Sequence, residues 1–171
     1  STIHSEGQRM RRLIDDMLFL SHADSHDFPI RMEPMEPDTL LLNSYEAFEA
    51  LAKEKNIRFG ILLPDSPMPA CLGDSGRLLQ LLAFLLHNAG GGSITLSLSH
   101  SARLYRPDSY TIAVADSGIG IPDGEKAKIF QRFYRSEASR SAKEHFGLGL
   151  CIAAEIVRSF HGSLRVEDTP G

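Results

Sequence analysis

Apolar residues recur along much of the chain at the spacing of a helix face. Between residues 1 and 24 they return at every third or fourth position and alternate with charged side chains, which predicts an amphipathic helix. The same spacing predicts four further helices, one of them rich in leucine. They are expected at residues 38–55, 75–88, 123–132 and 147–161. Asp74 is expected to cap the second of these, which ends at Asn88.

Shorter apolar segments between these helices predict strands. The expected positions are residues 57–63, 70–72, 93–100, 109–115 and 163–167, with one short strand around residues 28–32. Helices that alternate with largely antiparallel strands indicate an α/β fold. We expect a two-layer sandwich, in which one mixed, largely antiparallel sheet is covered by three helices.

A polar segment with Pro29, Pro34 and Pro37 separates the first helix from the rest of the chain. It predicts a linker over residues 25–37, because prolines interrupt regular structure. Residues 38–171 are then numerous enough to bury one substantial core.

The composition limits the classes of function. The 171 residues carry a formal net charge of −4 at pH 7, whereas nucleic-acid-binding domains are typically basic. Cys71 and Cys151 lie in apolar runs without metal-ligand spacing, so they are expected to be buried free thiols. No apolar run approaches the roughly 20 residues that a membrane-spanning helix needs. These features predict a cytosolic module that does not bind nucleic acid.

Two glycine-containing segments and one asparagine carry the candidate chemistry. The DSGIG segment (residues 116–120) follows a predicted strand, and its two glycines let the backbone lie flat against a planar ligand beside Asp116. The GLGL segment (residues 147–150) opens a predicted helix whose unpaired N–H groups can bind phosphate oxygens. Asn88 offers a neutral oxygen of the kind that Mg²⁺ accepts.

Each of these features also has a purely structural interpretation. A lone DxGxG run is often a tight turn, and Asn88 alone would more often end a core helix. The order and spacing of all three favour a binding site.

Taken in order, the helix with Asn88, the DSGIG segment, residues 129–135 (IFQRFYR) and the GLGL segment resemble the ATP-binding domain of sensor histidine kinases. That domain belongs to the GHKL ATPase superfamily, shared with DNA gyrase, the Hsp90 chaperone and MutL. The resemblance covers nearly the whole chain and implies the Bergerat fold. It implies that residues 1–24 are the C-terminal part of the second helix of a dimerisation hairpin. Residues 38–171 would be the ATP-binding catalytic domain, with its last strand missing.

The resemblance also implies roles for single residues. Asn88 would help to hold Mg²⁺, and Asp116 would accept a hydrogen bond from the adenine amino group. Residues 129–135 resemble the family's phenylalanine box, which anchors a mobile lid and places Arg132 and Arg135 near the triphosphate. The residues expected to contact the nucleotide are Asn88, Asp116, Gly118, Gly120, Ile121, Gly147, Leu148 and Gly149.

Three positions depart from the family pattern. Phe84 stands where the family usually has a second asparagine and its hydrolytic members a glutamate, so efficient ATP hydrolysis by their route is not expected. The connection after Asn88 is a short run of three glycines at residues 90–92. His145 replaces the glycine that usually leads the second glycine segment.

The function implied by the resemblance is histidine phosphorylation within a two-component system. The chain would bind Mg-ATP and donate the γ-phosphoryl group to a histidine on a dimerisation domain, from which an aspartate of a response regulator receives it. None of the seven histidines has the sequence context of the family's phosphoacceptor, so self-phosphorylation is not expected. The parent protein would be a homodimeric, membrane-anchored bacterial receptor with this part in the cytoplasm. The alternative is a nucleotide-binding pseudokinase or regulatory module without transfer activity.

Overall fold

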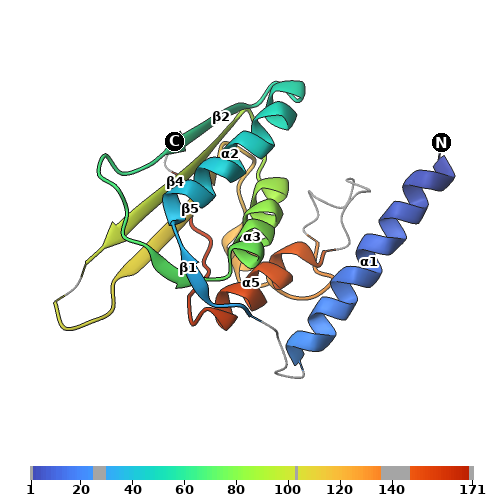
Figure 1. Cartoon of the computed structure of the whole chain (residues 1–171). Helices are drawn as coiled ribbons and strands as arrows, with labels where there is room; N and C mark the ends of the chain where they lie inside the picture. The colour runs from blue at the N-terminus through green and yellow to red at the C-terminus, as the bar shows by residue number, and fades with distance from the viewer. Residues whose placement is uncertain (1, 25–29, 103, 136–146, 170–171) are drawn as a thin grey trace. The chain divides into compact units, whose positions relative to one another are not determined.

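The computed structural model describes residues 2–24, 30–102, 104–135 and 147–169 (Figure 1). Their contacts divide the chain into a sheet unit, residues 31–120 and 167–171, and a helical unit, residues 1–30 and 121–166. The expected lid lies largely outside the described residues, as does part of the expected linker. The predicted domain boundaries stay a prediction.

The sheet unit contains two sheets. Its strands are β1 (Glu33–Met35), β2 (Arg58–Leu62), β3 (Cys71–Gly73), β4 (Ser93–Ser101) and β5 (Ser109–Asp116). β1 pairs antiparallel with β3, and the larger sheet has the order β2-β4-β5. Within the larger sheet β2 runs parallel to β4, whereas β5 runs antiparallel to it. This mixed sheet, together with its helices, confirms the predicted α/β class.

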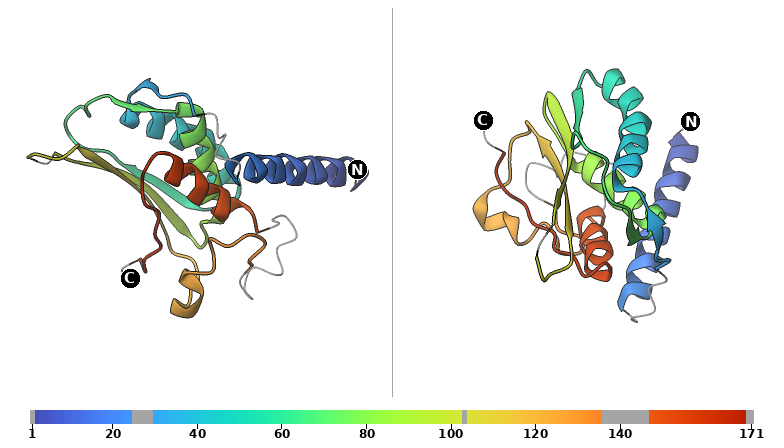
Figure 2. Two further views of the ribbon diagram at one scale, coloured as in Figure 1. Left: turned by 90° about the horizontal axis from the view of Figure 1, so that it is seen from below. Right: turned by 60° about the vertical axis from the view of Figure 1, so that its left-hand side comes forward.

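Two helices of the sheet unit, α2 (Pro37–Glu54) and α3 (Ser75–Asn88), lie on one face of the larger sheet (Figures 1 and 2). The core between them contains Leu41 of α2, Leu82 of α3 and Leu96 of β4, all fully buried. Asp74 caps α3 as predicted, because its Oδ1 accepts a hydrogen bond of 3.0 Å from the backbone N–H of Arg77.

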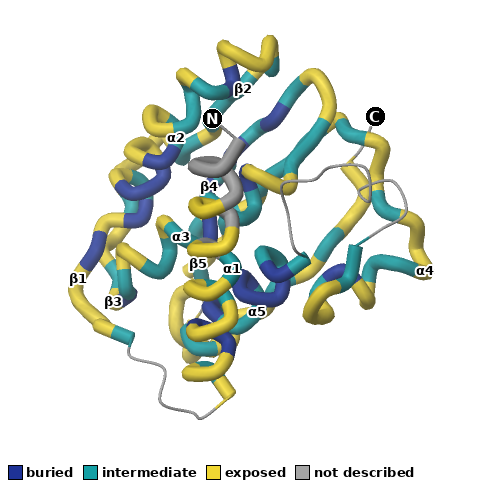
Figure 3. The backbone as a smooth tube through the Cα atoms, turned by 90° about the vertical axis from the view of Figure 1, so that its right-hand side faces the viewer, coloured by how far each residue is buried: buried dark blue, intermediate teal, exposed yellow. Residues whose placement is uncertain are grey.

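The helical unit contains α1 (Thr2–Asp24), α4 (Asp123–Lys126) and α5 (Gly149–Ser159), and α1 packs against α5. Figure 3 shows buried positions on both helices, and on α1 they lie together near its C-terminal end. They are Phe19 and Leu20 of α1, and Cys151, Ile152, Ala153 and Ile156 of α5. The helix predicted at residues 147–161 is therefore present, although it is shorter at both ends.

The helix predicted at residues 123–132 is wrong beyond Lys126. After α4 the chain forms turns in which Lys128 and Gln131 each donate a backbone hydrogen bond to the carbonyl three residues earlier. Phe133 then takes a left-handed conformation with φ of 61°, which no α-helix accommodates.

The strand predicted at residues 163–167 is also wrong. Leu164 and Val166 are half-buried between exposed neighbours, so the expected alternation exists, but the segment pairs with no strand in the described part of the chain. Alternation sets which side chains are covered, whereas a strand requires a neighbour that completes its backbone hydrogen bonds. For the same reason the short strand expected around residues 28–32 forms at Glu33–Met35, where β3 offers a partner.

Candidate functional site

Asp116 is the last residue of β5 and is opposite Ile94 of β4. It is half-buried, and its Oδ1 accepts a hydrogen bond of 2.7 Å from the backbone N–H of Gly118. Its other oxygen makes no hydrogen bond within the described part of the chain. The sheet therefore fixes the carboxylate at a strand end and leaves one oxygen to accept from a ligand.

The DSGIG segment packs closely against the three-glycine connection that follows α3. Gly91 has φ of 81°, and a Cβ atom there would overlap the backbone carbonyl of Ser117. A Cβ at Gly118 would lie 2.6 Å from Oδ1 of Asp116 and 3.3 Å from the carbonyl carbon of Gly90. The absence of side chains at these positions lets two backbone segments touch, so the protein itself already requires Gly91 and Gly118.

Ser117 joins this segment to the start of β4. Its backbone N–H donates to the carbonyl of Ser93 at 3.0 Å, and its Oγ accepts from the N–H of Ser93 at 3.0 Å. Gly120 follows with φ of 74° and no atom within 4 Å of an added Cβ, so the space beside it is open.

Asn88 ends α3 and is exposed. Its Nδ2 donates a hydrogen bond of 2.7 Å to the carbonyl of Phe84, one turn earlier. Among the described residues no hydrogen bond reaches its amide oxygen. Both interpretations of Asn88 are therefore compatible: the donor supports the helix end, and the acceptor oxygen can bind a metal ion. Two residues later Gly90 lies against Gly118, so the sheet unit brings the ends of α3 and β5 together.

In the helical unit Gly147 lies against residues 133–135. It has φ of 75°, and a Cβ atom there would lie 2.7 Å from the carbonyl oxygen of Tyr134. The backbone N–H of Phe133 donates to the carbonyl of Gly147 at 3.0 Å. The phenylalanine box and the GLGL segment are therefore joined through backbone atoms.

Other predicted site residues of this unit have distinct surroundings. Leu148 is only 1% exposed and precedes Gly149 at the start of α5, so only its backbone can contact a ligand. Ile121 and Arg135 are half-buried, and Arg135 lies beside Gly147. Nη2 of Arg132 contacts Oδ1 of Asp24, the last residue of α1, at 2.5 Å.

The Arg132–Asp24 ion pair shifts the pKa of both residues. The hydrogen bond from Arg132 lowers the pKa of Asp24, and the same bond raises the pKa of Arg132. No sequence pattern links residues 108 positions apart, so Asp24 could not be recognised as a partner from the sequence. Arg140 and Lys143, two further cations that the sequence places before Gly147, lie outside the described residues, as does His145.

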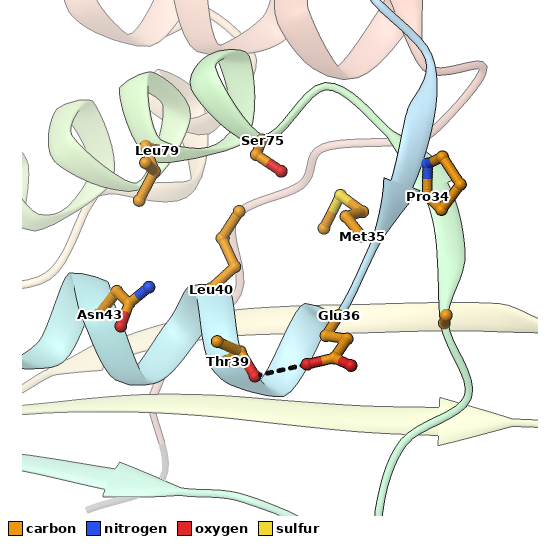
Figure 4. Close-up of a pocket in the computed structure, with 9 residues that line it drawn as sticks. Pro34, Met35, Glu36, Thr39, Leu40, Asn43, Ser75 and Leu79 are labelled. Carbon is orange, nitrogen blue, oxygen red and sulfur yellow. Dashed lines mark hydrogen bonds between the residues drawn. The ribbon is translucent and has the colours of Figure 1, made fainter.

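A cavity of about 410 Å³ opens at the other end of α3 (Figure 4). Ser75 and Leu79 of α3 line it together with Glu36 and Thr39 at the start of α2, and Oγ1 of Thr39 donates to Oε2 of Glu36 at 3.0 Å. Asn88 stands 13 residues beyond Ser75, about 20 Å along the helix at 1.5 Å per residue. A carboxylate at its edge disfavours phosphate, so this cavity is not the predicted nucleotide site.

Three comparisons place the chain among known proteins. The family described as histidine kinase-, DNA gyrase B-, and HSP90-like ATPase matches residues 73–171, more than half of the chain. Sensor histidine kinase WalK of Bacillus subtilis is 32% identical over 98% of this chain and 28% of WalK. Signal transduction histidine-protein kinase BaeS of Escherichia coli is 31% identical over 99% of this chain and 36% of BaeS.

A solved structure, full-length ShkA in complex with AMPPNP, matches with a TM-score of 0.82 and 25% identity. The match covers 99% of this chain and 35% of ShkA, so the chain spans about a third of the length of these proteins. Among the described residues no helix is both long and apolar enough to cross a membrane. The fold and the family match together assign the chain to the histidine kinase-, DNA gyrase B- and HSP90-like ATPases.

Proposed function

We propose that this chain is the ATP-binding catalytic domain of a two-component sensor histidine kinase. The family match and the names of WalK and BaeS support the proposal. The observation that carries it is the carboxylate of Asp116, which is half-buried at a strand end with one oxygen bound to Gly118 and the other available.

Asp116 recognises the base. A carboxylate oxygen accepts a hydrogen bond from the exocyclic amino group of adenine, and such charge-assisted bonds are strong and directional. Guanine has a carbonyl oxygen at that position, which the carboxylate repels. ATP is therefore preferred to GTP.

Asn88 is the protein ligand for Mg²⁺. Its amide oxygen is a hard, neutral donor without a hydrogen bond among the described residues, so it fits the ion. Those residues contain no group of three or more His, Cys, Asp or Glu side chains that could hold a metal. Asn88 would therefore hold the ion together with the phosphates of the nucleotide. Phosphoryl transfer requires mainly positioning and charge neutralisation, and Mg²⁺ supplies part of the latter.

The remaining contacts come from the glycines and from the helical unit. Gly118 and Gly120 present backbone to the nucleotide, as do Ile121 and Leu148. The N–H groups at the start of α5, from Gly147 to Gly149, bind phosphate oxygens. Arg135 beside Gly147 contributes positive charge, and the family resemblance implies the same role for Arg132.

The reaction requires partners. The γ-phosphoryl group passes to a histidine of a dimerisation domain and from there to an aspartate of a response regulator. α1 supplies part of a homodimer interface, because it exposes a row of apolar side chains. These are Met10, Ile14, Met17 and Leu18, each at least 50% exposed. The parent is a membrane-anchored receptor, and this part of it is cytoplasmic.

Isothermal titration of ATP and GTP, with and without Mg²⁺, tests the proposal. The informative variant is Asp116→Asn, because an asparagine can still accept from the N–H of Gly118 but replaces the second oxygen by an NH₂ group. We expect Mg²⁺-enhanced binding of ATP over GTP, and a loss of about 2 kcal/mol, roughly 30-fold in affinity, in the variant.

Asp108→Asn is the matched control. Asp108 is a carboxylate of the β4–β5 connection that pairs with His100, 3.0 Å away. This control should bind ATP as the unaltered chain does. Unchanged ATP affinity in Asp116→Asn, or equal affinities for ATP and GTP, would contradict the proposal, and binding without any Mg²⁺ effect would favour a pseudokinase.

A further inference from the structure

The ion pair between Arg132 and Asp24 joins the phenylalanine box to the end of α1. Its two atoms are 2.5 Å apart, and the side chains of Arg132 and Asp24 are 42% and 59% exposed. Both residues belong to the helical unit. The phenylalanine box is expected to contact the triphosphate. One of its two arginines, Arg132, is nevertheless bound to Asp24 of α1, 108 residues earlier in the chain.

The surroundings of Arg132 stabilise it in this position. Asp24 is the C-terminal residue of α1, where the helix dipole places partial negative charge that a cation stabilises. Glu155 of α5 contributes only a weaker, longer-range attraction, because its carboxylate is paired with Arg158 at 2.5 Å. To reach a phosphate, Arg132 would have to leave Asp24 and the C-terminal end of α1.

The residues that follow Arg132 in the phenylalanine box contact the GLGL segment. The N–H of Phe133 donates to the carbonyl of Gly147, and the carbonyl of Tyr134 occupies the space beside the Gly147 Cα. One ion pair and one backbone hydrogen bond thus form a continuous connection from α1 to the start of α5. Displacement of Arg132 would loosen the bond that fixes Gly147.

We propose that Asp24 is a positioning residue: through its ion pair with Arg132 it holds the phenylalanine box, and with it Gly147, in place for nucleotide binding. Arg132 is then a link to α1 and not a phosphate ligand. The part that concerns nucleotide rests on the proposed function. The part that concerns the Phe133–Gly147 bond does not.

The first test needs no nucleotide. The amide hydrogen of Phe133 reports the bond to Gly147 directly, so its exchange with solvent is measured in the unaltered chain and in Asp24→Asn and Arg132→Gln. Exposed ion pairs are weak, so we expect exchange of the Phe133 amide to accelerate by about two- to five-fold in each variant and no further in the double variant. Asp24→Glu should restore most of the protection.

Asp123→Asn is the matched control, because it breaks another exposed ion pair of the same unit, between Asp123 and Lys126 at 2.6 Å. Its Phe133 exchange should equal that of the unaltered chain. Unchanged Phe133 exchange in Asp24→Asn, or equal acceleration in Asp123→Asn, would overturn the proposal.

The second test measures the affinity for Mg-ATP in the same variants. A positioning role predicts that Asp24→Asn, Arg132→Gln and the double variant all lose affinity by the same factor, about two- to five-fold, with Asp24→Glu close to the unaltered chain. If Arg132→Gln loses ten-fold or more while Asp24→Asn is unaffected or binds more tightly, Arg132 contacts phosphate directly and the proposal is wrong. If no variant binds ATP and neither does the unaltered chain, the proposed function fails, whereas the exchange result still decides the role of Asp24.

Discussion

The backbone of Gly91 lies directly against the backbone of Ser117, so that no side chain fits between the connection after α3 and the DSGIG segment. Gly91→Ala adds a methyl group there, at a residue with φ of 81°. The strained backbone and the overlap with a carbonyl group should together destabilise the chain by at least about 2 kcal/mol. Urea unfolding measures the effect.

Gly92→Ala is the control for that variant. The neighbouring glycine has no atom within 4 Å of an added Cβ and no positive φ, so its replacement should change the free energy of unfolding by less than about 0.5 kcal/mol. Equal losses in the free energy of unfolding of the two variants would contradict the prediction, because they would show that the close backbone approach at Gly91 is not the cause of the destabilisation.

Asp74 should contribute stability that depends on pH. Burial raises its pKa, but hydrogen bonds from the backbone N–H groups of Arg31 and Arg77 outweigh burial and lower the pKa below 3.8. A lowered pKa in the folded state means that the contribution is present above the unfolded value and is lost as the pH falls through the folded one. As a helix cap, Asp74 should contribute about 1–2 kcal/mol at pH 7, so Asp74→Ala should lose that amount, and the loss should shrink as the pH falls below the ordinary pKa of an aspartate.

Denaturant titrations of the unaltered chain and Asp74→Ala at several pH values provide the measurement. Asp74→Asn keeps one acceptor oxygen for the helix N-terminus. Its free energy of unfolding at pH 7 should lie between those of the unaltered chain and Asp74→Ala. A difference between the unaltered chain and Asp74→Ala that does not shrink in acid would contradict the predicted role of the carboxylate.

Cys151 should be chemically inert in the folded chain. Burial raises its pKa to about 11, and its Sγ donates to the carbonyl of Leu148 at 3.1 Å. At pH 8 only about one thousandth of such thiols are thiolate, the form that reacts. A disulfide reagent should label Cys71, which is half-buried, well before Cys151.

Unfolding in guanidinium chloride should make both thiols react with the reagent at similar rates. In the folded chain, Cys151→Ser should abolish only the slow phase of labelling. Labelling of Cys151 as fast in the folded chain as in the unfolded one would contradict its burial.

The apolar row on α1 should drive self-association. Ile14 is 56% exposed in the middle of that row, so Ile14→Glu should weaken any concentration-dependent dimer seen by sedimentation, because a charge in an apolar interface is costly. Asp15→Ala, at an exposed neighbouring position, is the control and should leave association unchanged. Equal association in both variants would exclude this face of α1 as the contact.

The parts of the fold set by local periodicity were predictable. α2, α3, β4 and β5 lie within two residues of their expected ends, because apolar spacing reports which face of an element is covered. The strand expected at residues 163–167 failed because a ladder needs a neighbour, which the sequence of one segment cannot show. The helix expected at residues 123–132 ends at Lys126, and the turns that follow it are not marked by any breaking residue between Ala127 and Arg132.

The candidate site, like the fold, was predictable from the sequence only in part. Asp116, Gly118 and Asn88 were identifiable from their motifs, and the structure brings the ends of β5 and α3 together. Their roles toward a nucleotide stay predictions. Gly90 and Gly91 looked like a departure from the family, yet they form the surface on which Gly118 rests. The partnership of Asp24 with Arg132 depends on the packing of α1 against α5, for which no local pattern exists.

The pairing of β4 with β5 has a consequence for how this protein can vary. Eight residue pairs, from Ser101 with Ser109 to Ile94 with Asp116, set the face on which the Asp116 carboxylate stands. One residue inserted within β5 ahead of Asp116 would turn that carboxylate to the opposite face. Additions between Ser101 and Ser109 would leave the pairing intact, so relatives can differ in length between these strands while the Asp116 carboxylate keeps its orientation.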